Sequence, residues 1–482
     1  MKQTQEQANI VVFGGSGHWT ERNHYPAILS LKQQGYDVRV AAICDIVDPY
    51  SEMAHTNYTR ESLDQILAQD SPDWINPADF KDDNALIAHL QKYAVAHHLN
   101  VAIIATNPTR HYLYALWAAQ HNIHVLCDKP LIATPDASWV PAQAQLIEKQ
   151  FTKLLGVIRV HEKRNSNYTF CMPLRRRVLA PYVEIAQGLR DVYQRTGQGI
   201  THMNIIVNGG IHRYPREFLK AGAHGFVEGI GALSHSNYHY LDFMAWCLQL
   251  APGDAVSIGV RAVSVTRVQD YLNAEGYKQL MKLNKEDASI VAGNTKLSNS
   301  ILRAELDFTF CFTLYNAQGD PVGQIMYSNS HTAFSPRLAR YSADTLDHAN
   351  QYDGGRMSQV FVDVHQGVLQ NWLAIKNDIV FNENVIEVTR RKHPALKGKP
   401  LERKVFSKAY EIDTLTPVHL TEYFLKKTIG KATAAEIAQL PNITSQILSE
   451  RIFSACYEQI AHLYTRPTLF SEVIIPISSH LK

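Results

Sequence analysis

Short apolar runs alternate with longer amphipathic stretches over the first 140 residues of the chain. The runs at residues 9–13, 38–44, 101–105 and 123–127 are rich in Val, Ile and Ala and end in glycine or polar residues. Mostly apolar runs of this length are typical of buried strands, and helical patterns separate them. The alternation predicts an α/β fold with a doubly wound parallel sheet over residues 1–140.

The pattern changes after residue 140. Residues 224–250 combine glycines with a long amphipathic helix, and residues 317–320 have the composition of a hairpin turn. The length of the chain indicates a second domain, which we place at residues 141–482. Further helices are predicted at residues 141–152, 173–193, 420–428 and 445–464. Strands are predicted at residues 155–160, 203–207, 256–265, 304–315, 322–328, 361–364 and 379–381.

Composition narrows the class of protein. Of the 482 residues, 45% are hydrophobic and 19% charged, and the formal net charge is +2. This balance gives no reason to expect a nucleic acid or a membrane as partner, and the basic runs at residues 175–177 and 390–392 are short enough to be solvated faces. The six cysteines stand singly, which favours reduced core residues. Because the first residues lack the apolar core of a signal peptide, we expect a cytoplasmic protein.

A glycine-rich turn follows the first apolar run. Gly15 would allow a tight turn and Gly17 a close approach of the backbone to a pyrophosphate, which the start of the next helix would also bind. Thr20 stands where a third glycine is usual. The second strand ends at Asp45, an acid that can accept both ribose hydroxyls and repel a 2′-phosphate, so we favour NAD over NADP. The alternative is that Asp45 caps a helix or a turn. The predicted cofactor-binding residues of this turn are Gly15, Ser16, Gly17, His18 and Trp19.

Two further strand ends carry candidate chemistry. The strand at 101–105 runs into Thr106, Asn107 and Pro108, with His111 one turn later, and the strand at 123–127 runs into Asp128, Lys129 and Pro130. Open α/β sheets place their ligands at the carboxyl ends of the strands, so a lysine between an acid and a proline is a candidate there. The alternatives are a surface lysine for Lys129 and loop and helix-start chemistry for Pro108 and His111.

The third candidate cluster lies in the helical pattern near residue 240. His235 and His239 would lie on one face, one turn apart, with Asp242 beside His239 to orient its ring. Three interpretations stay open: two core histidines, a zinc site, and a substrate-facing acid/base pair. The zinc site lacks a third ligand in the sequence, so we predict no metal.

These motifs together resemble the Gfo/Idh/MocA family of glucose–fructose oxidoreductase and inositol dehydrogenase relatives. The resemblance rests on GGSGHWTERNHYPAIL at 14–29, AAICD ending at Asp45, ATNPTRH at 105–111 and CDKP at 127–130. It implies an N-terminal Rossmann domain and a C-terminal α+β domain whose large, mostly antiparallel sheet has helices on one face. The chain is longer than is typical of the family, and we place insertions near residues 208–226, 266–302 and 332–356.

The resemblance also implies roles for individual residues. The Asn107–Pro108 turn would lie beside the nicotinamide, and Lys129 and His239 would converge on the reacting oxygen. The family usually has Glu where Asp128 stands and Asp where His235 stands, which puts the usual proton relay in doubt. We predict Lys129, His239 and His235 as catalytic and substrate-binding residues, and Arg213 as a further substrate contact.

We therefore expect an NAD(P)-dependent oxidoreductase that acts on a secondary hydroxyl of a sugar, polyol or sugar derivative. A redox-neutral glycoside hydrolase or lyase that uses NAD transiently is one alternative within the family, and a non-catalytic NAD-binding sensor or regulator is another. By resemblance alone, the protein would be a homo-oligomer, either a dimer or a tetramer.

Overall fold

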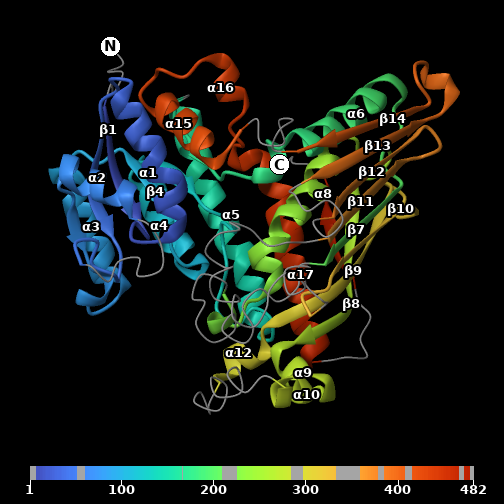
Figure 1. Ribbon diagram of the computed structural model, residues 1–482, viewed down its shortest axis with the longest axis horizontal. Helices are drawn as coiled ribbons and strands as arrows, with labels where there is room; N and C mark the ends of the chain where they lie inside the picture. The colour runs from blue at the N-terminus through green and yellow to red at the C-terminus, as the bar shows by residue number, and fades with distance from the viewer. Residues whose placement is uncertain are drawn as a thin grey trace. The chain divides into compact units, whose positions relative to one another are not determined.

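The computed structural model in Figure 1 describes residues 7–51, 60–165, 167–208, 225–283, 297–332, 359–377, 385–407, 415–465 and 472–477. By its internal contacts the chain divides into two compact units, each assembled from separate segments. These units are defined by packing and combine segments from both ends of the chain, so they do not test the domains predicted at residues 1–140 and 141–482, which stay a prediction. The first unit contains Met1–Ala133, Lys149–Arg175 and Leu415–Thr444, and the second contains Thr134–Glu148, Arg176–Thr414 and Ser445–Lys482.

A six-stranded parallel sheet forms the centre of the first unit. Its strand order is β3-β2-β1-β4-β5-β6, and every neighbouring pair is parallel. The order reverses at β1, which pairs with β2 on one side and β4 on the other, and ligands of such sheets bind at this reversal. The strands are β1 (Ala8–Phe13), β2 (Val38–Cys44), β3 (Asp73–Ile75), β4 (Val101–Ile104), β5 (His124–Cys127) and β6 (Phe170–Cys171).

Residues from far along the chain complete the core of this unit. Phe424, Leu425 and Ile429 belong to the same buried cluster as Tyr25 and Ile28 of the first helix. A C-terminal segment therefore covers the outer face of α1 (Figure 1). The helices of this unit are α1 (His18–Gln33), α2 (Glu61–Asp70), η1 (Pro77–Asp79), α3 (Asp83–Ala96), α4 (Pro108–Gln120), α15 (Pro417–Thr428), α16 (Ala434–Ala438) and the part of α5 (Pro141–Arg164) that begins at Lys149.

The second unit is built on a nine-stranded sheet in the order β14-β13-β12-β11-β7-β10-β9-β8-β15. All of its neighbours are antiparallel except β10 and β7, which are parallel. The predicted fold class, a parallel Rossmann sheet plus a large, mostly antiparallel sheet, is confirmed. The strands are β7 (His202–Asn208), β8 (Ser257–Arg267), β9 (Glu305–Tyr315), β10 (Pro321–Asn329), β11 (Gln359–Gln366), β12 (Gln370–Asn377), β13 (Ile386–Lys392), β14 (Leu401–Phe406) and β15 (Val473–Pro476).

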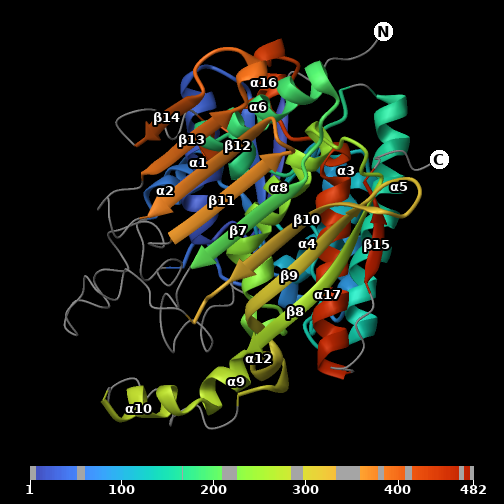
Figure 2. The same cartoon turned by 90° about the vertical axis from the view of Figure 1, so that its right-hand side faces the viewer.

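Helices cover one face of this sheet (Figures 1 and 2). Along β7, Met203, Ile205 and Val207 are buried while His202 and Ile206 are exposed, the alternation of a strand with one packed face. The covering helices are α6 (Ala180–Thr196), α8 (Tyr238–Leu250) and α17 (Ile447–Thr465). Shorter elements of this unit are η2 (Arg175–Arg177), η4 (Phe226–Glu228), η5 (Leu233–Asn237), α9 (Val268–Asn273), α10 (Glu275–Leu283), α12 (Asn299–Arg303), η8 (Pro394–Leu396) and η10 (Ile443–Gln446).

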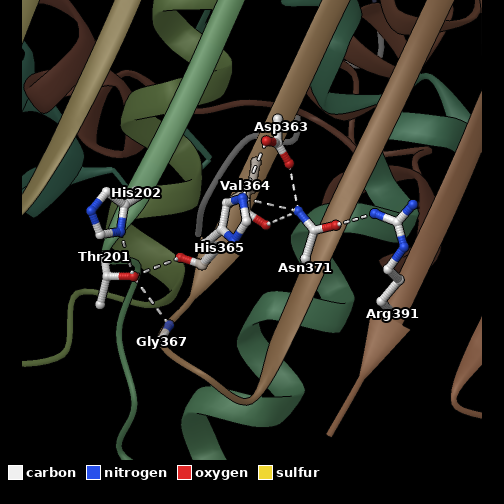
Figure 3. Close-up of polar contacts among 8 residues, drawn as sticks. All are labelled: Thr201, His202, Asp363, Val364, His365, Gly367, Asn371 and Arg391. Carbon is white, nitrogen blue, oxygen red and sulfur yellow. Dashed lines mark hydrogen bonds and ion pairs between the residues drawn. The ribbon is translucent and has the colours of Figure 1, made fainter.

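The opposite face of the sheet carries polar side chains that bond to one another across strands (Figure 3). The Nδ2 atom of Asn371 donates to Oδ1 of Asp363, and Nε2 of His365 lies 3.1 Å from the other carboxylate oxygen. His202 of β7 stands opposite His365, and Arg391 of β13 donates to Asn371. The homo-oligomer implied by the resemblance stays a prediction.

Two expectations about this part of the chain are wrong. Residues 155–160 lie inside α5 rather than in a strand, because Phe151, Leu154, Leu155 and Ile158 are buried at helical spacing. The run at 175–177 is not a solvated face, since the Arg177 side chain is only 7% exposed. The strand predicted at residues 379–381 lies outside the described residues. The predicted strands at 203–207, 256–265, 304–315, 322–328 and 361–364 and the hairpin turn are confirmed.

The six cysteines are free and buried, as expected of core residues. Burial raises the pKa of the Cys44 and Cys171 thiols to about 12, so both stay protonated near neutral pH. Within the part of the chain that the structure describes, no helix is both long and apolar enough to cross a membrane.

Two helical glycines give opposite expectations for stability. A Cβ atom added to Gly188 of α6 would overlap the indole ring of Trp372, whereas one added to Gly156 of α5 meets nothing within 4 Å. Gly188→Ala should lower the free energy of unfolding by about 1–3 kcal/mol through overpacking. Gly156→Ala should raise it by up to about 1 kcal/mol through helix propensity. Urea unfolding of both variants checks this, and equal effects would contradict the packing of α6 on β12.

Candidate functional site

The turn between β1 and α1 is packed directly against the end of β4. Gly14 has φ +79°, and a Cβ atom there would lie 2.5 Å from the Ala105 carbonyl oxygen. No other residue type fits this position without strain. The motif predicts that Gly15 provides the tight turn. This prediction is wrong, because Gly14 and not Gly15 has the left-handed conformation.

Gly15 is required for a different reason. A Cβ atom there would lie 2.6 Å from both Cγ2 of Ile43 and the hydroxyl of Tyr25, which donates to the Gly15 carbonyl over 2.9 Å. Thr20, in the place of the third glycine, donates its hydroxyl to the Gly14 carbonyl over 2.9 Å. Thr20 therefore stabilises the turn, and its side chain does not obstruct it.

The start of α1 is suited to an anion. Gly17 is the N-cap and has no side chain with which to cap the first turn. The first N–H groups of a helix lack partners within the helix and carry its positive dipole, so a phosphate is a natural ligand here. Trp19 is 45% exposed, and His18 is half-buried beside it. These features fit the predicted pyrophosphate contacts.

Asp45 joins the end of β2 to the same turn. Its Oδ2 atom accepts the Ser16 N–H over 2.9 Å and its Oδ1 atom accepts the Val47 N–H over 3.1 Å. Burial raises the pKa of this carboxyl group above its ordinary value, although these hydrogen bonds oppose the shift. Asp45 is thus a turn acid. Because a carboxylate offers about four acceptor sites, room is left for ribose hydroxyls as well.

His111 connects the loops after β4 and β5. Its Nδ1 atom lies 2.8 Å from the Pro130 carbonyl oxygen and its Nε2 atom 3.0 Å from that of Thr106. Burial lowers the pKa of His111, and a neutral ring donates to one of these carbonyls only. Asn107 caps α4 by accepting the Thr109 N–H over 3.1 Å. The structure thus gives His111 a positioning role, and its contact with a cofactor stays a prediction.

The segment after β5 contacts buried residues that were not predicted from the sequence, His24 and, through it, Thr421. The Lys129–Pro130 peptide bond is cis, and Lys129 is half-buried. Nε2 of His24, on α1, lies 3.6 Å from Oδ1 of Asp128, and its Nδ1 atom lies 3.0 Å from the Thr421 hydroxyl of α15. The signal in the sequence was His24 itself, a polar residue on the buried face of the α1 helix. The predicted residues of this unit therefore gather at the carboxyl ends of β1, β2, β4 and β5.

The predicted histidines lie in the second unit, at the start of α8. His235 belongs to η5, a π-helical turn, and His239 to the first turn of α8, and both are half-buried. Single π turns inside helices are frequent at functional sites. Lys129 belongs to the other unit, so its convergence with His239 stays a prediction. Arg213 lies outside the described residues.

Asp242 does not orient His239, which corrects our expectation. Its two carboxylate oxygens accept from Nε and Nη2 of Arg177 over 2.9 and 2.7 Å, and Ser449 donates to the same carboxylate. The Asp242 side chain is fully buried. Arg176 lies 4.5 Å above the ring of Tyr240 and donates to its hydroxyl. These residues fix α8 to its neighbours. Among the described residues, no group of three or more His, Cys, Asp or Glu is arranged to hold a metal.

Comparison with known proteins agrees with this architecture. Residues 8–152 match the model of the Gfo/Idh/MocA family, described as an oxidoreductase family with an NAD-binding Rossmann fold. This match confirms, over these residues, the resemblance seen in the motifs. None of the curated proteins matches the sequence.

Solved structures with the same fold cover nearly the whole chain. Levoglucosan dehydrogenase in complex with NADH and L-sorbose is 11% identical, with a TM-score of 0.54, 98% of this chain covered and 99% of that one. The transcriptional regulator Gal80p from Kluyveromyces lactis is 12% identical, with a TM-score of 0.54 and coverages of 99% and 93%. An NAD-binding oxidoreductase from Klebsiella pneumoniae is 14% identical, with a TM-score of 0.50 and coverages of 98% and 99%. At these identities the likeness concerns the fold.

The Arg177–Asp242 pair should be a main support of the second unit. Asp242→Ala leaves the buried guanidinium without its carboxylate and should lower the free energy of unfolding by about 3–5 kcal/mol. The matched control is Asp191→Ala, whose exposed pair with Arg190 is 3.9 Å long and should cost less than about 1 kcal/mol. Chemical denaturation measures both, and a loss at Asp242 as small as that at Asp191 would contradict the assignment.

Proposed function

We propose that the protein is an NAD-dependent oxidoreductase that transfers a hydride between a nicotinamide and a secondary hydroxyl of a sugar, polyol or sugar derivative. The β1–α1 turn carries the proposal. At Gly14 and Gly15 the neighbouring atoms leave no space for a side chain, and the turn leads into a helix whose N-cap, Gly17, has no side chain. Lys129 follows β5 at the same sheet edge.

The cofactor contacts belong to the proposal residue by residue. Residues Gly15 to Trp19 would surround the pyrophosphate, and the amides of the first turn of α1 would donate to it, because the Ser16 and Gly17 N–H groups already donate to Asp45 and to the Gly14 carbonyl. Asp45 would accept the ribose hydroxyls. Thr106, Asn107 and Pro108, with His111 behind them, would flank the nicotinamide, and Asp128 and Pro130 would set the position of Lys129. The bound cofactor supplies the hydride acceptor or donor.

Lys129 and His239 would together control the transfer of the substrate's hydroxyl proton. The Lys129 ammonium would hydrogen-bond the reacting oxygen and stabilise negative charge there, while the His239 imidazole would accept the hydroxyl proton. His235, in place of the family aspartate, would orient the substrate, and Arg213 would bind a further polar group.

The proposed substrate class and cellular compartment rest on two further observations. Levoglucosan dehydrogenase has the same fold, which agrees with a small sugar-like substrate. Six free, buried cysteines agree with a reducing compartment such as the cytoplasm. Gal80p, named as a transcriptional regulator, also has this fold, so a regulator is the second candidate. The presence of Lys129 favours the enzyme.

Reduced-cofactor absorbance with NAD⁺ and a panel of sugars tests the function. Net NADH formation is the expected outcome. Product without net NADH would indicate a redox-neutral hydrolase or lyase, and cofactor binding without turnover of any sugar would indicate a regulator.

Lys129 and His239 should act on the same step. Lys129→Ala and His239→Ala should each lower kcat by about 10²–10⁴-fold with little change in NAD affinity. If both groups serve one oxygen, the double variant should lose far less than the product of the two single losses. Lys92→Ala, at an exposed position of α3, is the control. Multiplicative losses would show that the two side chains act separately, and unchanged turnover in Lys129→Ala would remove Lys129 from the mechanism.

Asp45 should set the choice of dinucleotide. Asp45→Asn removes the charge that would repel a 2′-phosphate but keeps an oxygen for the Ser16 N–H, so the NADP/NAD preference should rise by about tenfold or more. Asp45→Ala should also weaken NAD binding, because the turn loses both of its hydrogen bonds. Fluorescence titration of each dinucleotide measures the ratio. An unaltered ratio in Asp45→Asn would mean that Asp45 is only a turn acid.

A further inference from the structure

A buried network of side chains ties the π turn η5, which contains His235, to the sheet of the second unit. Asn237, the last residue of η5, contacts Tyr327 and Asn329 of β10, and each of the three is at most 2% exposed. The Asn237 side-chain nitrogen donates to Oδ1 of Asn329 over 3.0 Å. The Tyr327 hydroxyl lies 2.7 Å from Oδ1 of Asn237 and 2.9 Å from its carbonyl oxygen. Both polar atoms of the Asn237 side chain are therefore bonded to β10.

Two main-chain carbonyls fix the orientation of both amides in this network. Nδ2 of Asn329 donates to the Leu306 carbonyl of β9 over 2.8 Å, so its Oδ1 atom is the one turned to Asn237. Nδ2 of Asn237 also donates to the Ala232 carbonyl over 3.0 Å, which leaves its Oδ1 atom for the Tyr327 hydroxyl. Because a carbonyl only accepts, turning either amide over would place two acceptors against each other. The network therefore has one arrangement.

The bond from Asn237 to Ala232 acts on the helical turn itself. It runs from a side chain to the carbonyl five residues earlier, just before the first residue of η5. A side chain that inserts into the helical ladder in this way opens the turn, because it competes with the backbone donors. The Tyr327 hydroxyl reaches the carbonyl at the other end of the turn, that of Asn237. Side-chain donors at both ends thus stabilise the wide turn over a regular α-helical one.

The two histidines depend on this turn to different degrees. His239 belongs to α8, which the pair of Asp242 and Arg177 fixes in the interior. His235 lies inside η5, between the two carbonyls that the network bonds. A π turn contains one residue more than an α-helical turn, so its relaxation would rotate the residues before it by about 100° about the helix axis. The direction of His235 relative to His239 would then change.

We propose that Asn237, Tyr327 and Asn329 are positioning residues for substrate binding, because they keep the π turn in the form that directs His235 to the substrate. The inference rests on the proposed function, since it needs His235 to contact the sugar. The three residues act only through that histidine, because they are buried between the turn and β10. Their loss should therefore weaken substrate binding more than it slows the chemical step.

Steady-state kinetics on the full chain, with the sugar that yields NADH, tests the proposal. Tyr327→Phe removes one hydroxyl and should raise KM by about threefold to tenfold, the factor that one neutral hydrogen bond is worth. Its kcat should change less, because His239 stays in place. Asn237→Ala removes the whole amide and should raise KM by about tenfold or more. Added to His235→Ala, Tyr327→Phe should raise KM no further, whereas a general loss of structure would multiply the two effects.

The ring signals of isotope-labelled histidines in NMR spectra give a second measurement, which needs no turnover. The signals of the two histidines are assigned with His235→Ala and His239→Ala. In Tyr327→Phe the His235 signal should shift, and the His239 signal should shift less. Tyr315→Phe is the matched control, because it removes a phenol hydroxyl that donates to Glu472 over 2.6 Å at the other end of β9. It should change neither histidine signal and leave KM unaltered.

Two results would overturn the proposal. One is a His235 signal that does not shift in Tyr327→Phe or Asn237→Ala, whatever the turnover, and the other is a further rise of KM when Tyr327→Phe is added to His235→Ala. A shifted signal in a protein that turns over no sugar would refute the oxidoreductase but support the hold of the network on His235. If Asn237→Ala does not fold, Tyr327→Phe decides, because it keeps the ring that packs on Phe308.

Discussion

The contact between Gly14 and the carbonyl of Ala105 is the constraint on which the rest of the first unit depends. It brings the turn after β1 against the end of β4, where a side chain would leave only 2.5 Å. Because Gly14 and Gly15 have no side chains, only backbone atoms of these residues lie beside the start of α1. Thr20 and Asp45 then hold that backbone, one by a hydroxyl to Gly14 and the other by a carboxylate to Ser16.

A second layer of side chains determines where the residues after β4 and β5 lie. His111 contacts carbonyls of both loops, and His24 lies between Asp128 and Thr421 of α15. These two buried rings take no part in the chemistry we propose. Their effect is to limit the movement of Lys129 and Asn107, and positional precision of this kind is what hydride transfer requires of a protein.

In the second unit, the η5 turn and the first turn of α8 carry the half-buried residues His235 and His239 next to a largely apolar helix. Arg177 and Asp242 form a bidentate pair in the interior, and Ser449 of α17 completes the set of hydrogen bonds around Asp242. The π turn before α8 changes the rotation of the chain just where His235 lies. This charge pair fixes α8, the helix that follows the turn, since breaking either partner leaves a buried charge.

The local sequence pattern was enough to predict four of the six parallel strands, the presence of a glycine turn, the strand-end position of Lys129 and the hairpin at residues 317–320, but not β3 or β6. Each depends on residues close together in the chain, whose spacing repeats with the period of a strand or a turn. The same reasoning failed for residues 155–160, where a short apolar run fits a strand and a buried helix equally well. It also failed for Arg176 and Arg177, whose partners Tyr240 and Asp242 lie more than 60 residues away in the sequence. Which glycine takes a positive φ, which acid pairs with which base, and which C-terminal helix covers α1 depend on contacts between distant segments. Only the tertiary structure decides these, because burial gives a charge or a close approach its energy, and burial is a property of the assembled fold.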